Sequence, residues 1–333
     1  AITGIIIAYF SYRRDLPVLI SSAFTPLLGD AARGPIGKAI DSLAIIATLF
    51  GTATSLGLGA QQINSGLDFL WGTGVSNGIA LTIIAVLTVA FILSAVSGVG
   101  KGIQYLSNIN MVLAVVLLVF LAVVGPTTFI MNTFPEALGD YLTNLVSMSF
   151  RTAAFSDGEW LKNWTIFYWA WWVSWAPFVG VFIARISRGR TIREFVVCVL
   201  LVPSAVTFVW FTIMGGSALH SELVGQGGLV EAVRDEGAAI SLFALLDQYP
   251  MASLTCMLAM FLVAIFFVSG ADAGSVVMGM LSERGTTEPT APVVVIWGVL
   301  AGASAAILLV MGGLQGLQTA SIIAAAPFLL VMA

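Results

Sequence analysis

Nine apolar segments dominate this chain, and they decide what it can fold into. They cover roughly residues 1–12, 43–66, 78–97, 109–133, 164–186, 195–219, 251–281, 291–312 and 319–333, and we expect the first and last to be incomplete. A helix needs about 20 apolar residues to cross the hydrocarbon core of a bilayer. Backbone groups in lipid must be hydrogen-bonded within the chain, and these runs show no period of two. We therefore predict membrane-spanning helices rather than a β-barrel.

The composition excludes most soluble functions. Of the 333 residues, 59% are hydrophobic and only 9% are charged, whereas soluble domains carry about 25% charged residues. One histidine and two distant cysteines cannot assemble a metal cluster, and the chain has no phosphate-binding loop and no visible nucleophile with a base. We expect an all-α, multi-pass protein of the cell (inner or plasma) membrane that is not an enzyme, has no cofactor and binds no nucleic acid.

The basic residues predict how these helices are oriented. Ten of the thirteen Lys and Arg residues lie in one set of alternating loops, formed by residues 13–42, 98–108, 185–194 and 281–290. The other set of loops holds the remaining three and most of the acidic residues. By the positive-inside rule, the first set is predicted to be cytoplasmic.

Two segments between the apolar runs are too polar to cross a membrane. Residues 134–163 place apolar residues at near-helical spacing beside Glu136 and Asp140, which predicts an amphipathic helix along the outer interface. Residues 220–250 are predicted to form an acidic external loop. It begins with the single histidine, His220, to which we assign no role.

The stretch FYWAWWVSWAPF, residues 167–178, gathers four tryptophans in one apolar segment. On a helix, Trp171 and Trp175 share a face, and Trp172 lies three residues before Trp175. These rings are expected to lie about 10–17 Å deep at 1.5 Å per residue, too deep for an aromatic belt at the headgroups. Bundle packing and a cage of ring faces for a quaternary ammonium group both stay open, and the cage is favoured. Pro177 follows the cluster and is expected to loosen this helix.

A stripe of hydroxyl groups marks the segment 43–66. Thr48, Thr52 and Ser55 fall at positions i, i+4 and i+7, on one face of a helix. Such hydroxyls commonly bond back to their own helix, and the small residues around them commonly serve only close packing. Since the stripe is predicted to lie level with the tryptophans, we also consider a site for Na⁺, which binds hydroxyl and carbonyl oxygens.

An acidic residue, Asp272, lies late in the apolar segment 251–281. Intramembrane acids are costly and are often functional, so an ion-binding or gating role is one hypothesis. The alternative is a solvated position near the cytoplasmic end of the helix. The sequence does not choose between them.

At this point the chain resembles the betaine/choline/carnitine transporter (BCCT) family, and among its members the sodium-coupled glycine betaine permeases. The resemblance rests on FYWAWWVSWAPFVGVFIARISRGRTIREF, SAVSGVGKGIQYLSNINMV and IDSLAIIATLFGTATSLGLGAQQINSG. It implies a LeuT-type fold of twelve transmembrane helices with two inverted five-helix repeats, of which about nine helices are present. Residues 1–133 would then be the rest of the first repeat, 134–163 the interfacial helix and 164–333 the second repeat.

The resemblance also implies roles for individual residues. In the family, tryptophans of the eighth helix form the substrate cage, a serine of the fifth helix lies nearby, and two threonines with an aromatic ring bind sodium. The matching substrate residues are Trp171, Trp172, Trp175 and Ser55, with Trp169 just outside the cage, and the matching sodium residues are Thr48, Thr52 and Phe178.

A second sodium site of the family pairs the third and tenth helices. Its tenth-helix pattern is Phe followed by adjacent Thr and Ser, and the matching positions here are Phe266, Ser269 and Gly270. One hydroxyl is therefore kept and the other is lost, which predicts a weakened site. The family is commonly trimeric, with the interfacial helix, residues 134–157 here, at the contact.

Together these features predict a secondary transporter that imports glycine betaine with Na⁺ for osmoprotection, as a homotrimer in contact with membrane lipids. Within the family, the alternatives are a proton-coupled choline transporter and a sodium-independent carnitine or betaine transporter. In another class, the alternative is a channel or osmosensor that binds betaine without moving it against a gradient. A further possibility is that this chain, without the first helices of the family, transports nothing by itself.

Overall fold

The computed structural model describes residues 1–96 and 100–333, with the side chains of residues 100–106 left aside, and the described residues form helices and loops without strands. The main helices are α1 (Ile2–Arg13), α3 (Pro35–Trp71), α4 (Asn77–Val96), α5 (Gly100–Val124), α6 (Thr127–Ser149), α7 (Phe167–Ile186), α8 (Ile192–Leu223), α11 (Ala252–Ser282) and α12 (Ala291–Met332). Shorter helical elements are η1 (Ser21–Phe24), α2 (Thr25–Leu28), η2 (Gly29–Arg33), a π-helical turn (Leu161–Ile166), α9 (Leu229–Glu236), η4 (Ala238–Ile240) and α10 (Ser241–Asp247). The all-α prediction is confirmed.

Within the described residues, seven helical stretches are long and apolar enough to cross a membrane: α3, α4, the part of α5 from Ser107, the π-turn with α7, α8, α11 and α12. The chain is thus a multi-pass membrane protein. Two of the nine predicted segments are not counted separately among the seven. One is α1, which has only 12 residues, and the other is the second half of α12.

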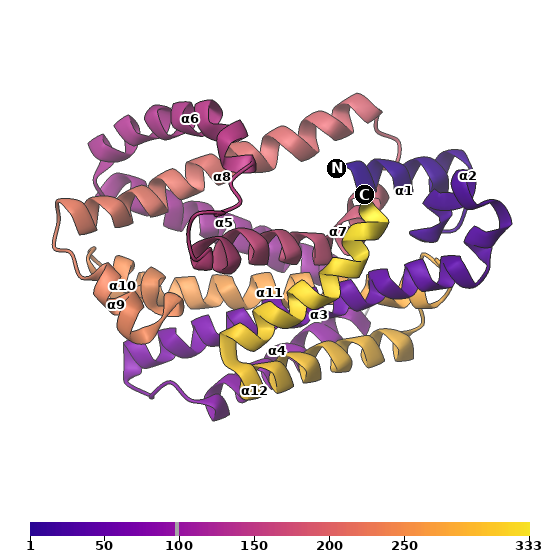
Figure 1. The fold of residues 1–333 in the computed structure, drawn as a ribbon. Coiled ribbons are helices and arrows are strands. Elements are labelled where there is room, and N and C mark those ends of the chain that lie inside the picture. Colours follow the sequence, from indigo (N-terminus) through magenta and orange to yellow (C-terminus); the bar gives the residue numbers. More distant parts are fainter. Residues whose placement is uncertain (97–99) are drawn as a thin grey trace.

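Helix α12 has 42 residues, about twice what one crossing requires. Its backbone leaves the helical region at Gly313, with φ 55° and ψ −144°. Figure 1 shows the ribbon turning back at this bend, so that its yellow end leaves in a new direction. A side chain would be strained at that positive φ, and a Cβ at Gly316 would stand 2.9 Å from the Leu308 carbonyl oxygen. Glycines therefore make the bend that divides α12 into the two predicted segments.

The end of α5 corrects one predicted boundary. The apolar segment 109–133 was expected to be one span, but α5 ends at Val124 and α6 begins at Thr127. Gly125 and Pro126 separate them, because proline has no N–H to continue the helix and disfavours a helical residue before it. The interfacial helix predicted from residue 134 therefore starts seven residues earlier, and residues 139–149 of it are all exposed.

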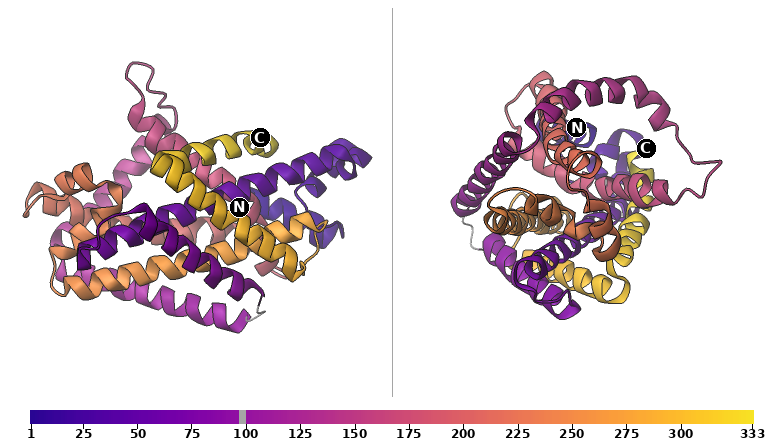
Figure 2. Two further views of the ribbon diagram at one scale, coloured as in Figure 1. Left: turned by 90° about the horizontal axis from the view of Figure 1, so that it is seen from below. Right: turned by 90° about the vertical axis from the view of Figure 1, so that its left-hand side faces the viewer.

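Helix α3 is the centre of the bundle and packs on α12, α11, α7 and α4. Its glycines allow this close approach: an added Cβ at Gly57 would meet a methyl carbon of Leu317 at 2.4 Å, and one at Gly59 would meet the Phe267 ring at 2.2 Å. Thr54 also donates a hydrogen bond to the Leu317 carbonyl at 3.1 Å. Figures 1 and 2 place α6 and α8 on the opposite side of the bundle from the first half of α12, before its bend. The small-residue face expected on this helix is thus a packing surface.

The predicted external loop is largely structured. Helix α9, η4 and α10 fold onto the ends of α8 and α11, and Leu229, Ile240 and Phe243 are buried there. Ser221 donates a hydrogen bond to Gln248, which in turn donates to the Gly227 carbonyl. These contacts hold the segment as a compact cap rather than an open loop.

We predict that Gly57→Val lowers the stability of the protein by about 1–3 kcal/mol, because overpacked side chains must displace Leu317. The thermal unfolding midpoint of the purified protein in detergent measures this. Gly139→Val on α6 is the matched control, since an added Cβ there meets nothing within 4 Å. Equal midpoints for the two variants would contradict a close contact between α3 and α12.

Candidate functional site

The aromatic cluster of α7 lies against α3 at a glycine. A Cβ at Gly51 would stand 2.4 Å from Ser174 Oγ and 2.8 Å from Trp175 Cδ1. Because Gly51 has no side chain, the indole of Trp175 reaches the backbone of α3. The spacing of small residues on one helix therefore sets the position of a tryptophan on another.

Trp171 is oriented by a short chain of hydrogen bonds. Its indole Nε1 donates to Ser55 Oγ at 3.1 Å, and Ser55 Oγ donates to the Gly51 carbonyl at 3.0 Å. Ser174 Oγ donates to the Trp171 carbonyl at 2.6 Å. The structure thus brings together the serine and the first tryptophan that the sequence nominated, and it fixes the direction in which the ring faces.

The rings of Trp171 and Trp175 stand at a right angle to each other. Their centroids are 6.3 Å apart with an interplanar angle of 79°. Phe178 follows at 5.3 Å from Trp175, edge to face, and Phe167 stacks on Trp171 at 5.8 Å. A cation within about 6 Å of a ring centroid is attracted to the ring face. Two nearly perpendicular indoles can therefore form the corner of a cage.

The other two tryptophans of the cluster lie elsewhere. Trp172 is 66% exposed and Trp169 is 69% exposed, and no ring contact within the described part of the chain includes either of them. Both lie on the outer surface of α7. The structure therefore assembles two of the three nominated cage rings around Ser55 and leaves the third, Trp172, open to the surroundings.

The irregular part of this helix is not where the sequence suggested. Helix α7 continues as an α-helix through Pro177, so this residue does not interrupt the helix. A π-helical turn at Leu161–Ile166 precedes α7 instead. Such turns often occur next to functional sites, but no residue pattern in the sequence signalled this one.

The predicted sodium residues are buried close to the cage. Thr48, Thr52 and Phe178 are each less than a tenth exposed. Thr48 Oγ1 donates to the Ala44 carbonyl at 2.8 Å, which leaves its oxygen free to accept or to ligate. Thr52 faces α11, where a Cβ at Gly274 would be 3.0 Å from its Oγ1. These oxygens fit a small hard cation in chemical type.

The residues predicted for the second sodium site are in a different environment. Phe266 is 55% exposed, and Ser269 is only partly buried. Ser269 Oγ donates to the Phe266 carbonyl of its own helix at 3.0 Å. At the next position, a Cβ on Gly270 would contact only Trp175 Cη2, at 3.5 Å. The two nominated sets are therefore unlike: one is buried where α3, α7 and α11 approach one another, and the other is only partly buried on α11.

Asp272 is buried between two helices. It is 5% exposed, and its Oδ2 accepts a hydrogen bond from Ser94 Oγ of α4 at 2.8 Å. The hypothesis of a solvated residue at the helix end is therefore wrong. Since residues two apart on a helix point in nearly opposite directions, Asp272 lies on the far side of α11 from Gly270 and Gly274. It links α11 to α4 rather than lining the cage.

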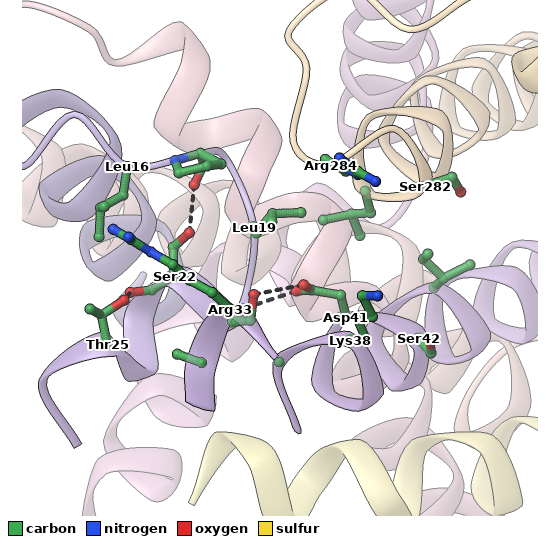
Figure 3. Close-up of a pocket in the computed structure, with 16 residues that line it drawn as sticks. Leu16, Leu19, Ser22, Thr25, Arg33, Lys38, Asp41, Ser42, Ser282 and Arg284 are labelled. Carbon is green, nitrogen blue, oxygen red and sulfur yellow. Dashed lines mark hydrogen bonds between the residues drawn. The ribbon is translucent and has the colours of Figure 1, made fainter. Parts of the chain in front are cut away.

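A cavity of about 710 Å³ opens at the end of α3 that is predicted to be cytoplasmic. Figure 3 shows the inner end of α3, the segment from Leu16 to Arg33 and the end of α11 around it. The buried carboxylate of Asp41 accepts two hydrogen bonds from Ser21, from N at 2.9 Å and from Oγ at 2.6 Å. Sequence reasoning missed this pair, because Ser21 gave no pattern of its own. Asp41 thus fastens the connection between α1 and α3 over the cavity.

We predict that Ser21→Ala loosens this connection, because one oxygen of a buried carboxylate loses its donor at a cost of about 1–3 kcal/mol. Hydrogen–deuterium exchange of residues 14–34 in the purified protein should become faster. Ser42→Ala is the matched control, since Ser42 also lines the cavity but is exposed. Unchanged exchange in the Ser21 variant would show that Asp41 does not hold the segment.

Comparison with known proteins identifies one family, which matches the whole chain. The model of BCCT, the betaine/carnitine/choline family transporter, matches residues 1–333. The chain is 49% identical to the glycine betaine transporter OpuD of Bacillus subtilis (strain 168) over 334 residues, which is 100% of this chain and 64% of that protein. It is 47% identical over 335 residues to a probable glycine betaine transporter of Desulfitobacterium hafniense (strain Y51), covering 100% and 67%.

Similarity extends to relatives with other named substrates. The chain is 40% identical over 332 residues to the ectoine/hydroxyectoine transporter of Virgibacillus pantothenticus, which is 100% of this chain and 66% of that protein. The chain therefore spans about two thirds of the length of these relatives. Their names agree on transport and differ in the solute.

Proposed function

Since this chain belongs to the BCCT family of transporters, we propose that it is part of a secondary transporter for a quaternary-ammonium compatible solute. The solute that we propose first is glycine betaine, imported together with Na⁺. The main observation that supports this is the nearly perpendicular pair of Trp171 and Trp175, in which Trp171 is bonded to Ser55 of α3, the helix that also carries the buried Thr48 and Thr52. The import of such a solute would serve osmoprotection.

The chemistry of a quaternary ammonium group explains why rings would bind it. Such a group carries charge but has no N–H to donate, so hydrogen-bond acceptors gain little from it. Indole faces attract it electrostatically, by up to about 2 kcal/mol where the group is desolvated. Ser55 is already bonded to Trp171, so its role in the cage is to orient the indole rather than to bind the charge.

Sodium would act through the contact between α3 and α7. Thr48 and Thr52 lie on α3, and Phe178 of α7 touches Trp175 edge to face. An ion bound there favours the arrangement in which these helices are together, and this is also the arrangement that builds the cage. Ion and solute then raise each other's affinity, which is the thermodynamic requirement for coupling.

Two alternatives within the family are each favoured by one observation. Gly270 lacks the hydroxyl of the second sodium site, which favours weak or absent sodium coupling. The named substrates of the relatives include ectoine, which favours a broader solute range. Uptake against a concentration gradient separates any of these transporters from a channel or an osmosensor, since neither of those can concentrate its ligand.

The assembly that we propose is a homotrimer in the membrane with α6 at the contact. Residues 139–149 of α6 are all exposed, although several of them are large and apolar. Large exposed apolar surfaces commonly mark contacts with other proteins or with lipid.

We predict that Trp171→Leu and Trp175→Leu each weaken glycine betaine binding about 30-fold, the equivalent of about 2 kcal/mol for one lost ring face. Titration of tryptophan fluorescence in the full-length protein measures the affinity. Trp71→Leu is the control, because Trp71 is exposed at the end of α3. Unchanged affinity in both cage variants would remove the cage hypothesis, and Trp172→Leu tests the exposed third ring.

We predict that Thr48→Val and Thr52→Val each raise the sodium concentration for half-maximal betaine uptake by about 10-fold or more, if the loss of one oxygen ligand costs as much as a hydrogen bond to a charged group, about 1.5–3 kcal/mol. The control is Thr82→Val, an exposed threonine of α4 whose hydroxyl also donates to its own helix. Undiminished uptake by the parent protein when K⁺ replaces Na⁺ would contradict sodium coupling altogether.

A further inference from the structure

Trp175 stands between two glycines that belong to different helices. On the α3 side, a Cβ at Gly51 would stand 2.8 Å from Trp175 Cδ1, closer than real side chains approach. On the α11 side, a Cβ at Gly270 would stand 3.5 Å from Trp175 Cη2, which is an ordinary contact. The indole of Trp175 is therefore in close contact with Gly51 and leaves room for a methyl group at Gly270.

Close packing does not explain why residue 270 is a glycine. The other two glycines of α11 are needed for packing: a Cβ at Gly274 would be 3.0 Å from Thr52 Oγ1, and one at Gly279 would be 2.9 Å from Pro289 Cβ. Apart from its chain neighbours and the backbone of its own helix, only Trp175 Cη2 among the described atoms comes within 4 Å of a Cβ at Gly270. Glycine is also among the poorest residues in a helix interior. Alanine would fit at position 270 and favour the helix, so the absence of a side chain beside Trp175 is the feature to explain.

Within the described part of the chain, the space between Gly270 and Trp175 has no charged side chain beside it. Asp272, the acid of this stretch, lies on the opposite side of α11 and is bonded to Ser94. The nearest hydroxyl on the helix, Ser269, donates to the Phe266 carbonyl. Size rather than charge is therefore what the space can select.

We infer that Gly270 determines the size of solute that the site accepts. Because residue 270 has no side chain, the Trp175 ring can move toward α11, and the cage then accepts ammonium groups bulkier than trimethylammonium. This inference rests on the proposed function, because it requires that Trp171 and Trp175 bind a cation. The ring has no room to move toward α3, because Trp175 Cδ1 already lies against the backbone of Gly51. Movement toward α11 is the direction left open, and a side chain at position 270 closes it.

The test compares two cations of equal charge and different size, tetramethylammonium and tetraethylammonium, in the full-length protein. Each is titrated as a competitor of labelled betaine against the parent protein, Gly270→Ala and Gly270→Ser. The parent should bind both cations. In both variants the affinity for tetramethylammonium should stay within about twofold, and that for tetraethylammonium should fall about 10-fold or more, as expected when a pocket loses room for a methylene-sized group.

Gly215→Ala on α8 is the matched control, because an added Cβ there meets nothing within 4 Å. It should leave both affinities unchanged. A parent protein that is folded but binds neither betaine nor tetramethylammonium would overturn the proposed function. If the parent binds tetramethylammonium but excludes tetraethylammonium, or if Gly270→Ala changes the two affinities equally, this inference fails while the proposed function stands. A loss confined to Gly270→Ser also overturns it, since the hydroxyl and not the volume would then be responsible.

Discussion

The close approach of α3 to its neighbours is the constraint on which the rest of the structure depends. Lipid tails are as apolar as side chains, so helices in a bilayer associate mainly through tight packing and interhelical hydrogen bonds. On α3, Gly51 meets Trp175 and Ser174, Gly57 meets Leu317, and Gly59 meets Phe267. Three different helices are thus held at distances that a single methyl group on α3 would prevent.

The candidate site is a consequence of this packing. The indole of Trp175 lies flush with α3 only because Gly51 has no side chain, and Trp171 then comes within hydrogen-bonding distance of Ser55. The same approach encloses Thr48 and Thr52 beside Phe178. Two tryptophan rings and a set of buried hydroxyl oxygens are thus brought to the same pair of helices, α3 and α7.

Polar contacts away from the cage have a different role. Asp272 joins α11 to α4 through Ser94, and Asp41 joins α3 to the preceding segment through Ser21. Each is a buried carboxylate that accepts hydrogen bonds, and burial without such partners would be costly. Neither acid lies at the rings, so in the proposed cage a cation would be attracted by the indole faces rather than by a neighbouring carboxylate.

The sequence by itself determined that the chain is built from membrane-spanning helices, the rough extent of most of them and the shared face of Trp171 and Trp175. All of these follow from the hydrophobicity and spacing of nearby residues, which a helix of known period converts directly into geometry. Only the tertiary structure decided that Ser55 bonds Trp171, that Trp172 lies outside and that Asp272 faces Ser94. These outcomes depend on how side-chain volumes on two distant helices fit together, and no local pattern in either helix contains that information.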